Sequence, residues 1–575
     1  MGRRKVVDER NPPPRTLEVT IVAQDPTVLD KRSNDRGRRI LRAKVKVPAD
    51  RLEPGPWGPR FHVVDYDATT GTYLKPAKQT VPVDGADLTD RQMVSDAGFR
   101  AWNVYAVAAR TLAAFEFALG RPVPWAFGSH QLYLVPTAFA EENAYYAGDD
   151  QALFFGYFPE RGGRTAYTCL SHDIVAHETT HAILDGLRSG FDLPGLPDQA
   201  AFHEGFADVV ALLLVFSVPE VVETLIGDPR RKRLNEADVS GDRLARSALL
   251  KLGEQLGDAV HVKRGEGLRR SVALEPTTEW RDPANLEWQV PHRRGEILVA
   301  AVTHTLVLMW RQRLEALVHG GTLDRQRAAE EGSKSARHLL EMAIRAIDYC
   351  PPVDFEYEDF LNAVLVSDAE VAPDDAQNYR GALREAFGRF GIEPAPPPAE
   401  ALTHQTDRMS FRDFSFQALR ADRDEVFRFI WDNAASLGID PAYHLRVEAV
   451  SPSTRIGPNG FVVNETVVNY VQQLGGTAAE LRSAAPDLRL PEGLAEDTKI
   501  KVYGGGTLIF DQFGVVKHHH AKPLADWDRQ SRRLEYLVSQ GQSDTRGAIG
   551  SSLGVPAGQR FAQIHQSDEN SSEEW

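Results

Sequence analysis

Apolar and polar residues form short runs of strand type over the first 95 residues. Three of these runs, LEVTIVA, RILRAKVKV and RFHVVDYD, carry β-branched or aromatic residues, and turns such as EPGPWGP and ATTG separate them. Proline and glycine mark turns between strands because their backbones suit tight changes of direction. The pattern predicts a small β-rich domain over residues 1–95.

The pattern changes to a helical period at about residue 96. GFRAWNVYAVAARTLAAFEFAL spaces its apolar residues as a helix does, and two short extended runs, HQLYLVP and QALFFGYF, follow it. Nearly every later periodic segment up to residue 393 predicts a helix. We expect a mixed segment over 96–190, a helical segment over 191–393 and a proline-rich linker over 394–408.

The pattern changes again beyond the linker. A helical segment, RDEVFRFIWDNAASLG, precedes four runs that predict strands, which are YHLRVEAV, GFVVNETVVNYV, KIKVYG and TLIFDQFGVVKHHH. Another helix is predicted near residues 526–539. We expect a separate α+β domain over 409–562, and a disordered tail over 563–575, because SDENSSEEW is charged and poor in apolar residues.

Composition limits the possible partners. The chain has 575 residues, a length too great for one compact core. Its hydrophobic content of 42% is sufficient for the cores of several domains. Its formal net charge of −15 repels polyanions, so we expect no nucleic acid and no membrane among its partners.

The sequence also bears on the compartment. No apolar run follows the basic residues of MGRRKVVDER, and the most apolar stretches, FADVVALLLVF and ILVAAVTHTLVLMW, are too short to cross a bilayer. The two cysteines, Cys169 and Cys350, lie far apart and form no disulfide framework. These features favour a cytoplasmic protein with buried core helices.

One helical segment carries candidate chemistry. In HDIVAHETTHAIL, His177 and His181 are four residues apart, so they lie on one face of a helix, as two imidazole ligands of a tetrahedral metal require. Glu178 follows the first histidine and is placed to take a proton from a metal-bound water. The alternative is an ordinary buried helix, but unpaired buried polar groups cost about 1 to 3 kcal/mol each.

A catalytic zinc site needs a third protein ligand. A histidine six residues after the second one is excluded, because that position holds Leu187. The segment AFHEGFADVVALLLVF offers Glu204, with Asp208 one turn later to orient a histidine ligand through its other ring nitrogen. The alternative is that both acids only stabilise the positive end of a helix dipole.

Five segments together resemble the thermolysin-type metallopeptidases, or gluzincins. They are ENAYYAGDDQALFFGY, HDIVAHETTHAIL, HEGFAD, GLRRSVALEP and LEWQVPHRRGEILVAAVTHTL. The resemblance implies a two-lobed zincin core, with a mixed α/β N-lobe at 96–190 and a mostly helical C-lobe at 191–393. The predicted fold class is multi-domain α+β, in which a β-rich N-terminal domain and an α+β C-terminal domain flank this core. One zinc ion per chain is also implied.

The resemblance assigns further roles. Asn143 and Ala144 would hold a peptide substrate at an edge strand, and Arg269 or Arg270 would bind a substrate carbonyl. His292 would stabilise the oxyanion. Glu287 would be the acidic partner of His292, and Ile174 and Leu268 would line the pocket for the residue after the scissile bond.

The sequence also departs from the family. A tyrosine that helps to stabilise the oxyanion is expected between His181 and Glu204, and that segment has none. Val215 stands where a calcium-binding glutamate is expected, and Asp173 remains at another calcium position. One carboxylate does not supply the six to eight oxygens of a Ca²⁺ site, so we expect no double calcium site.

These features lead to a zinc-dependent metalloendopeptidase that acts on a peptide or protein substrate. In this hypothesis His177, His181 and Glu204 hold Zn²⁺, Glu178 is the general base and His292 stabilises the developing charge. An alternative is a binding or scaffold protein with a vestigial or structural zinc site. A second metal site at KHHH, residues 517–520, has no obvious third ligand.

Overall fold

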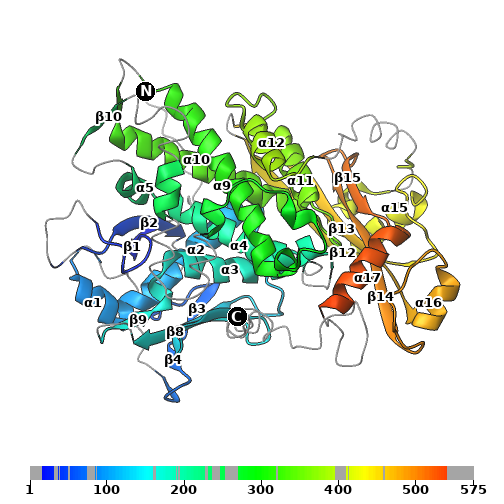
Figure 1. Ribbon diagram of the computed structural model, residues 1–575, viewed down its shortest axis with the longest axis horizontal. Helices are drawn as coiled ribbons and strands as arrows, with labels where there is room; N and C mark the ends of the chain where they lie inside the picture. Colours follow the sequence, from blue (N-terminus) through cyan, green and yellow to red (C-terminus); the bar gives the residue numbers. More distant parts are fainter. Residues whose placement is uncertain are drawn as a thin grey trace, which may run out of the picture.

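The computed structural model describes part of the 575-residue chain. The described residues are 16–540 apart from 31–36, 38, 49–51, 74–84, 86, 160–162, 189–190, 192–194, 227–230, 236–245, 253–269, 319–321, 395–408, 412–413 and 458–459. The predicted tail, and all of the predicted linker except its first residue, lie outside them. Figure 1 shows the C-terminal sheet at one end of the long axis and the first strands at the other.

The N-terminal strands pack on a long helix. Strands β1 (Thr16–Val22) and β2 (Arg42–Pro48) form an antiparallel pair in which Val19 faces Val45. Their buried residues contact α2 (Ala97–Leu119) in a shared core. Helix α2 begins after Asp96, whose side chain accepts a hydrogen bond from the Phe99 amide, as an N-cap does.

A five-stranded sheet follows, and β7 lies at one of its edges. The strand order is β3-β6-β8-β7, with β9 also paired to β8. The first three strands are parallel, whereas β7 and β9 run antiparallel to β8. The bounds are β3 (Phe61–Val63), β6 (Leu132–Phe139), β7 (Ala144–Ala147), β8 (Ala152–Pro159) and β9 (Thr165–Tyr167).

This sheet crosses the domain boundary that the sequence suggested at residue 95. Strand β3 comes from the first segment and pairs with β6 from the second. One hydrophobic core also contains residues of both, from Val19 to Ile392. The first strands therefore complete the following fold, because a two-stranded ribbon alone cannot bury its apolar face.

Helices form the middle of the molecule. The helix α3 (His172–Leu187) packs on α2, on the edge strand β7 and on α4 (Pro197–Phe216), and α4 packs on α9 (Pro291–Glu315) and α10 (Arg325–Ala346). By length and composition α4 is the one described helix that could cross a membrane, and 89% of its most apolar window is buried. The other helices are α1 (Asp90–Ser95), α5 (Pro219–Leu225), α11 (Tyr357–Val371) and α12 (Tyr379–Arg389).

Short elements complete this part. They are the strands β4 (Tyr66–Asp67), β5 (Thr72–Tyr73), β10 (Arg233–Asn235) and β11 (Thr322–Asp324), and the 3₁₀ helices η1 (Thr168–Leu170), η3 (Glu279–Arg281), η4 (Leu286–Gln289) and η5 (Ile347–Tyr349). Of these, η4 leads directly into α9. It therefore sets where the first turn of α9 begins.

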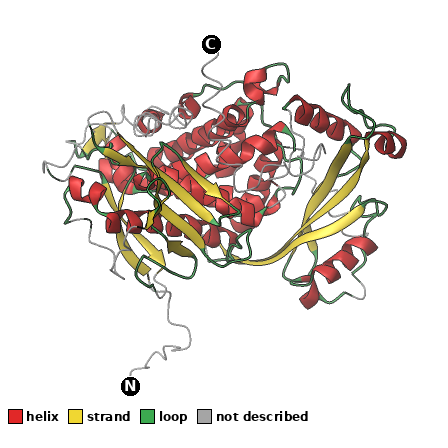
Figure 2. Cartoon of the chain, turned by 90° about the horizontal axis from the view of Figure 1, so that it is seen from below, coloured by secondary structure: helices red, strands yellow, loops and turns green. Residues whose placement is uncertain are grey.

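The C-terminal part is a four-stranded antiparallel sheet with helices around it. The order β12-β13-β14-β15 follows the chain, and the strands form a long twisted ribbon beside the helical body (Figure 2). The bounds are β12 (His444–Ile456), β13 (Val462–Thr477), β14 (Lys499–Phe510) and β15 (Val516–Lys522), with α14 (Phe416–Leu419), α15 (Arg423–Asp432), α16 (Ala478–Ala484) and α17 (Trp527–Ser539).

Two hydrophobic clusters of its own lie on this sheet, and Val467 of β13 and Ile509 of β14 also join the main core. The mixed α/β, multi-domain class predicted from the sequence is thereby confirmed. One expectation differs, because KIKVYG and TLIF form a single strand, β14, across three glycines. The backbones of β13 and β14 approach closely here, since a Cβ on Gly505 would lie 2.5 Å from the Tyr470 carbonyl oxygen. Only glycine permits this approach, so the glycines lie within the strand and do not end it.

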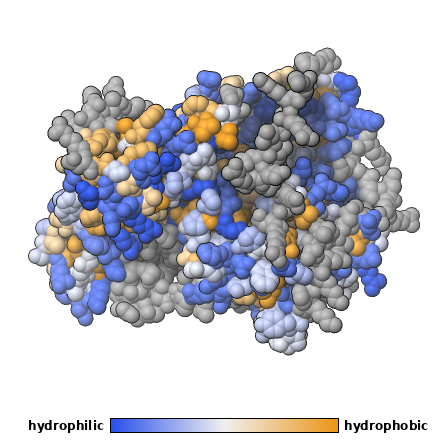
Figure 3. All heavy atoms as spheres, turned by 180° about the vertical axis from the view of Figure 1, so that it is seen from behind, coloured by the Kyte–Doolittle hydropathy of each residue, from blue (hydrophilic) through white to orange (hydrophobic). Residues whose placement is uncertain are grey.

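Buried ion pairs join the C-terminal sheet to the helices. Asp348 contacts Arg121 of the loop after α2 (2.7 Å) and Arg455 of β12 (2.6 Å). Asp354 forms ion pairs with Arg529 and Arg533 of α17. On the face of the molecule seen in Figure 3, small groups of hydrophobic residues lie among hydrophilic ones.

Candidate metal centre

Helix α3 brings two imidazoles together. His177 and His181 are buried, and their Nε2 atoms lie 2.8 Å apart. Their rings are nearly perpendicular, at 82°, with centroids 4.4 Å apart. The i, i+4 spacing places both rings on one face, as the sequence predicted. Their Nε2 atoms therefore point to a common position.

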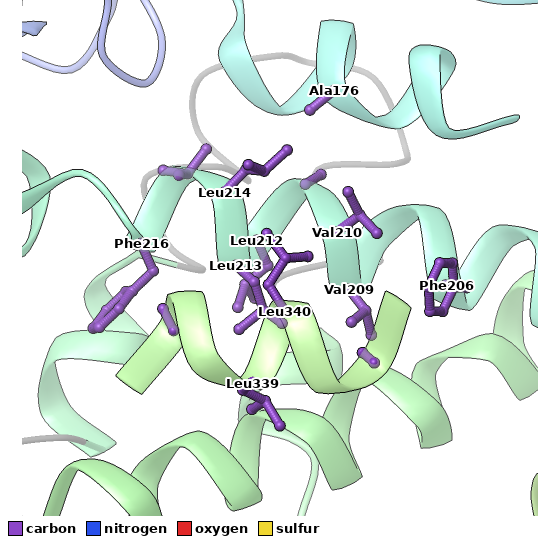
Figure 4. Packing of buried hydrophobic residues seen from close by; sticks show 14 of the residues in the cluster. Ala176, Phe206, Val209, Val210, Leu212, Leu213, Leu214, Phe216, Leu339 and Leu340 are labelled. Atoms are coloured by element: carbon purple, nitrogen blue, oxygen red, sulfur yellow. The ribbon is translucent and has the colours of Figure 1, made fainter. Parts of the chain in front are cut away.

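Helix α4 supplies a carboxylate to the same position. Glu204 Oε2 lies 3.4 Å from His177 Nε2, and Glu204 Oε1 lies 3.5 Å from His181 Nε2. Among the described residues these three form the one buried group whose possible ligand atoms all lie within 4.8 Å of one another. In Figure 4 α4 lies between α3, which carries Ala176, and α10, which carries Leu339 and Leu340. This packing places Glu204 of α4 next to α3.

The electrostatics suit a cation. Burial alone would raise the pKa of Glu204, but the nearby His181 and His292 and two hydrogen bonds hold the pKa of this carboxyl well below its usual value. Burial lowers the pKa of His181. An ionised carboxylate is the form of Glu204 that binds a metal ion.

The geometry fits a tetrahedral ion. Two ligand atoms at about 2.0 to 2.1 Å from zinc in a tetrahedron lie roughly 3.3 Å apart. The two Nε2 atoms are 2.8 Å apart, and each lies 3.4 to 3.5 Å from a different oxygen of Glu204. With one ligand atom from each residue, all three lie within 4.8 Å of one another. A metal ion can therefore be held by His177, His181 and Glu204.

Each histidine has a partner on α4 for its other ring nitrogen. Asp208 Oδ1 lies 2.8 Å from His177 Nδ1, as expected from the sequence. His203 Nδ1 lies 3.3 Å from His181 Nδ1, and the two rings are stacked. Such partners fix the orientation of ligand rings. The sequence reasoning missed His203, although its position directly before Glu204 was a signal.

Glu178 and His292 lie beside this group. Glu178 is fully buried on α3, and its charge acts on His181. His292 is the second residue of α9, and its Nδ1 lies 3.7 Å from Glu204 Oε2. Its side chain is 27% exposed, so it stands at the rim of the buried group. The structure thus brings together six residues that the sequence selected, which are His177, Glu178, His181, Glu204, Asp208 and His292.

The expected partner of His292 lies elsewhere. Glu287 accepts a hydrogen bond from Arg293 Nε (2.7 Å), and its side chain is 62% exposed. Arg293 stacks on Trp288 at 4.1 Å and also pairs with Glu296. The Arg293 guanidinium offers this carboxylate a charged donor, and the role of Glu287 in orienting His292 stays a prediction.

Two of the predicted substrate residues lie at the start of the edge strand β7, which packs on α3. Ala144 is the first residue of the edge strand β7, and its amide donates to the Asn143 side chain (2.8 Å). Tyr146 of β7 donates a hydrogen bond to Asp185 of α3 (2.8 Å), which ties this edge to the metal helix. An edge strand can accept an added peptide strand.

The remaining predicted residues are only partly described. Arg270 is 55% exposed and binds Glu296 Oε1 (2.8 Å), which lies one turn after His292 on α9. Ile174 is buried on α3. Arg269 and Leu268 lie outside the described residues.

The calcium-related positions lie on two helices. Val215 is fully buried in the apolar part of α4. Asp173 Oδ1 lies 2.8 Å from the Ser171 hydroxyl, which is also 2.7 Å from Asp25. Burial raises the pKa of Asp25 to about 6. The expected lack of a double calcium site stays a prediction.

The KHHH segment lies in β15. His520 Nε2 lies 3.0 Å from Asp359 Oδ1, and His519 contacts the Tyr470 hydroxyl (2.9 Å). Burial lowers the pKa of His518 to about 3. These contacts support packing of β15 against its neighbours.

Comparison of the sequence with protein-family models finds no match, and comparison with curated proteins finds none either.

Proposed function

We propose that this protein is a zinc-dependent metalloendopeptidase of thermolysin-like type. The observation that carries the proposal is the convergence of His177, His181 and Glu204 with Glu178 and His292 beside them. A zinc ion held there would acidify a water molecule and polarise the carbonyl of a peptide bond. The substrate would be a peptide or protein.

Other side chains would transfer the proton, stabilise the developing charge and align the substrate. Glu178 takes a proton from the attacking water and returns it to the leaving amine. His292 donates a hydrogen bond to the carbonyl oxygen as negative charge develops. A substrate strand lies along β7, where Asn143 and Ala144 align it, and Arg270 reaches the same face of α9 as His292.

Glu178→Gln tests this mechanism, because it keeps the size of the side chain and removes the base. We expect hydrolysis of apolar-rich peptides to fall by about 10²- to 10⁴-fold, while zinc content is retained. The matched control is Glu330→Gln, which changes a partly exposed glutamate of α10 and should keep both. Unchanged hydrolysis in Glu178→Gln would exclude the mechanism.

A second candidate is a binding or scaffold protein with a structural zinc site. It is favoured by the position of Glu287, which pairs with Arg293, together with the missing tyrosine between His181 and Glu204. In this case zinc removal would unfold the protein, whereas Glu178→Gln would leave partner binding unchanged. Peptide hydrolysis by the wild type that a chelator abolishes would exclude it.

A further inference from the structure

Helices α4 and α9 carry Glu204 and His292, and the two helices touch through their backbones. A Cβ on Gly205 would lie 2.8 Å from the Gly295 carbonyl oxygen, and a Cβ on Gly295 would lie 3.1 Å from the Ala201 carbonyl oxygen. Glycine is needed at this crossing because any side chain would push the helices apart. The crossing sets the distance between the helices and leaves their relative rotation to other contacts.

A buried ion pair lies beside the crossing. Arg294 Nε, in the first turn of α9, is 2.5 Å from Asp198 Oδ1, in the first turn of α4. Arg294 also donates to the carbonyl oxygens of Trp280 (2.8 Å) and Trp288 (3.2 Å). One guanidinium therefore holds α4 and the loop that leads into His292.

Tyr357, the first residue of α11, closes this network. Its amide donates to Asp198 Oδ2 (3.0 Å), and its hydroxyl donates to the Arg294 carbonyl oxygen (3.0 Å). Asp198, Arg294 and Tyr357 are all buried. Hydrogen bonds among buried charged groups have defined geometry, so the first turns of both helices are held in one arrangement.

We propose that Arg294 is a positioning residue, which with Asp198 sets His292 at its place beside Glu204. His292 is two residues before Arg294, in the same turn of α9. Since Glu287 binds Arg293, the backbone of this turn takes the positioning role that the sequence gave to Glu287. The catalytic consequence rests on the proposed function.

The test uses the zinc-loaded full chain and neutral pairs, because Arg294 alone cannot be removed without leaving a buried carboxylate. The variant is Asp198→Asn with Arg294→Gln. The matched control is Arg313→Gln with Glu331→Gln, a pair that joins the other end of α9 to α10. Zinc affinity, kcat and KM are measured for both, each also in a His292→Ala background.

We expect zinc affinity within about twofold of wild type, because its ligands lie on α3 and α4. The value of kcat should fall by at least about tenfold with KM nearly unchanged, and His292→Ala should then add little. In wild type the same change should lower kcat by about 10²- to 10³-fold. The control pair should keep kcat and the full effect of His292→Ala.

Three results would overturn the inference: full additivity with His292→Ala, an equal loss of kcat in the control pair, or loss of zinc together with activity. If zinc-loaded wild type hydrolyses no peptide, the proposed function fails instead. Amide exchange of residues 292–296 then decides the positioning role. Faster exchange in the Asp198 and Arg294 variant than in the control supports it, and equal exchange rejects it.

Discussion

Replacing Asp208 should weaken zinc binding by a predictable amount. Its carboxylate lies 2.8 Å from His177 Nδ1. This contact fixes the orientation of the ring and keeps the proton on Nδ1, so that Nε2 is free to bind a metal ion. Loss of such a partner typically lowers metal affinity by about 10- to 100-fold, or about 1.4 to 2.7 kcal/mol. The Asp208 side chain is 19% exposed, so water can replace part of the bond. We expect Asp208→Ala to lower zinc affinity by about 10- to 30-fold, near the lower end of this range.

Asp208→Asn should lower zinc affinity less than Asp208→Ala does, because its amide oxygen still accepts a hydrogen bond. Some loss should remain, since this oxygen carries no charge. The matched control is Asp359→Asn, which alters a histidine–carboxylate contact with His520 outside the metal group. Competition with a chromophoric chelator gives the zinc affinity of each variant, and circular dichroism checks the fold. A folded Asp208→Ala protein with wild-type zinc affinity would refute the reasoning.

Three other predictions concern stability. Chelation should lower the thermal midpoint and added zinc should restore it, since ligand at 100 times its Kd adds about 2.7 kcal/mol; a midpoint unaffected by zinc would contradict this. Gly205→Ala should destabilise the protein to urea by about 1 to 3 kcal/mol, because the new Cβ meets Gly295, whereas Gly128→Ala, in open space, should not. Burial alone would raise the pKa of Asp348, but Arg121 holds it at about 2. The stability that this ionised carboxylate contributes is present above pH 4 and lost as pH falls towards 2. Asp348→Asn should therefore flatten the pH dependence of the free energy of unfolding in urea across this window, and an unchanged acid dependence would reject the assignment.

Much of the fold followed from local pattern. The helical period at RDEVFRFIWDNAASLG predicts the helix that the structure places at Arg423–Asp432, and the helix expected near 526–539 is Trp527–Ser539. The pairing of strands was less accessible. Strand β3 joins a sheet whose other strands lie about 70 residues or more further along the chain, and a pattern of period two does not specify a distant partner.

The helical repeat alone specifies which pairs of ligands one helix can present. His177 with His181, and Glu204 with Asp208, are each separated by four residues, and the helical repeat places such residues on one face whatever surrounds them. Whether Glu287 pairs with His292 or with Arg293 lies beyond that rule, because it depends on which charged group packing brings nearest.

The way in which α3, α4 and α9 meet depends on tertiary packing. The crossing at Gly205 and Gly295 and the pair of Asp198 with Arg294 bring His292 to Glu204 across 88 residues of sequence. Contacts between segments so far apart result from packing of whole surfaces and from the burial of charge with its partner. No local period in the chain encodes them.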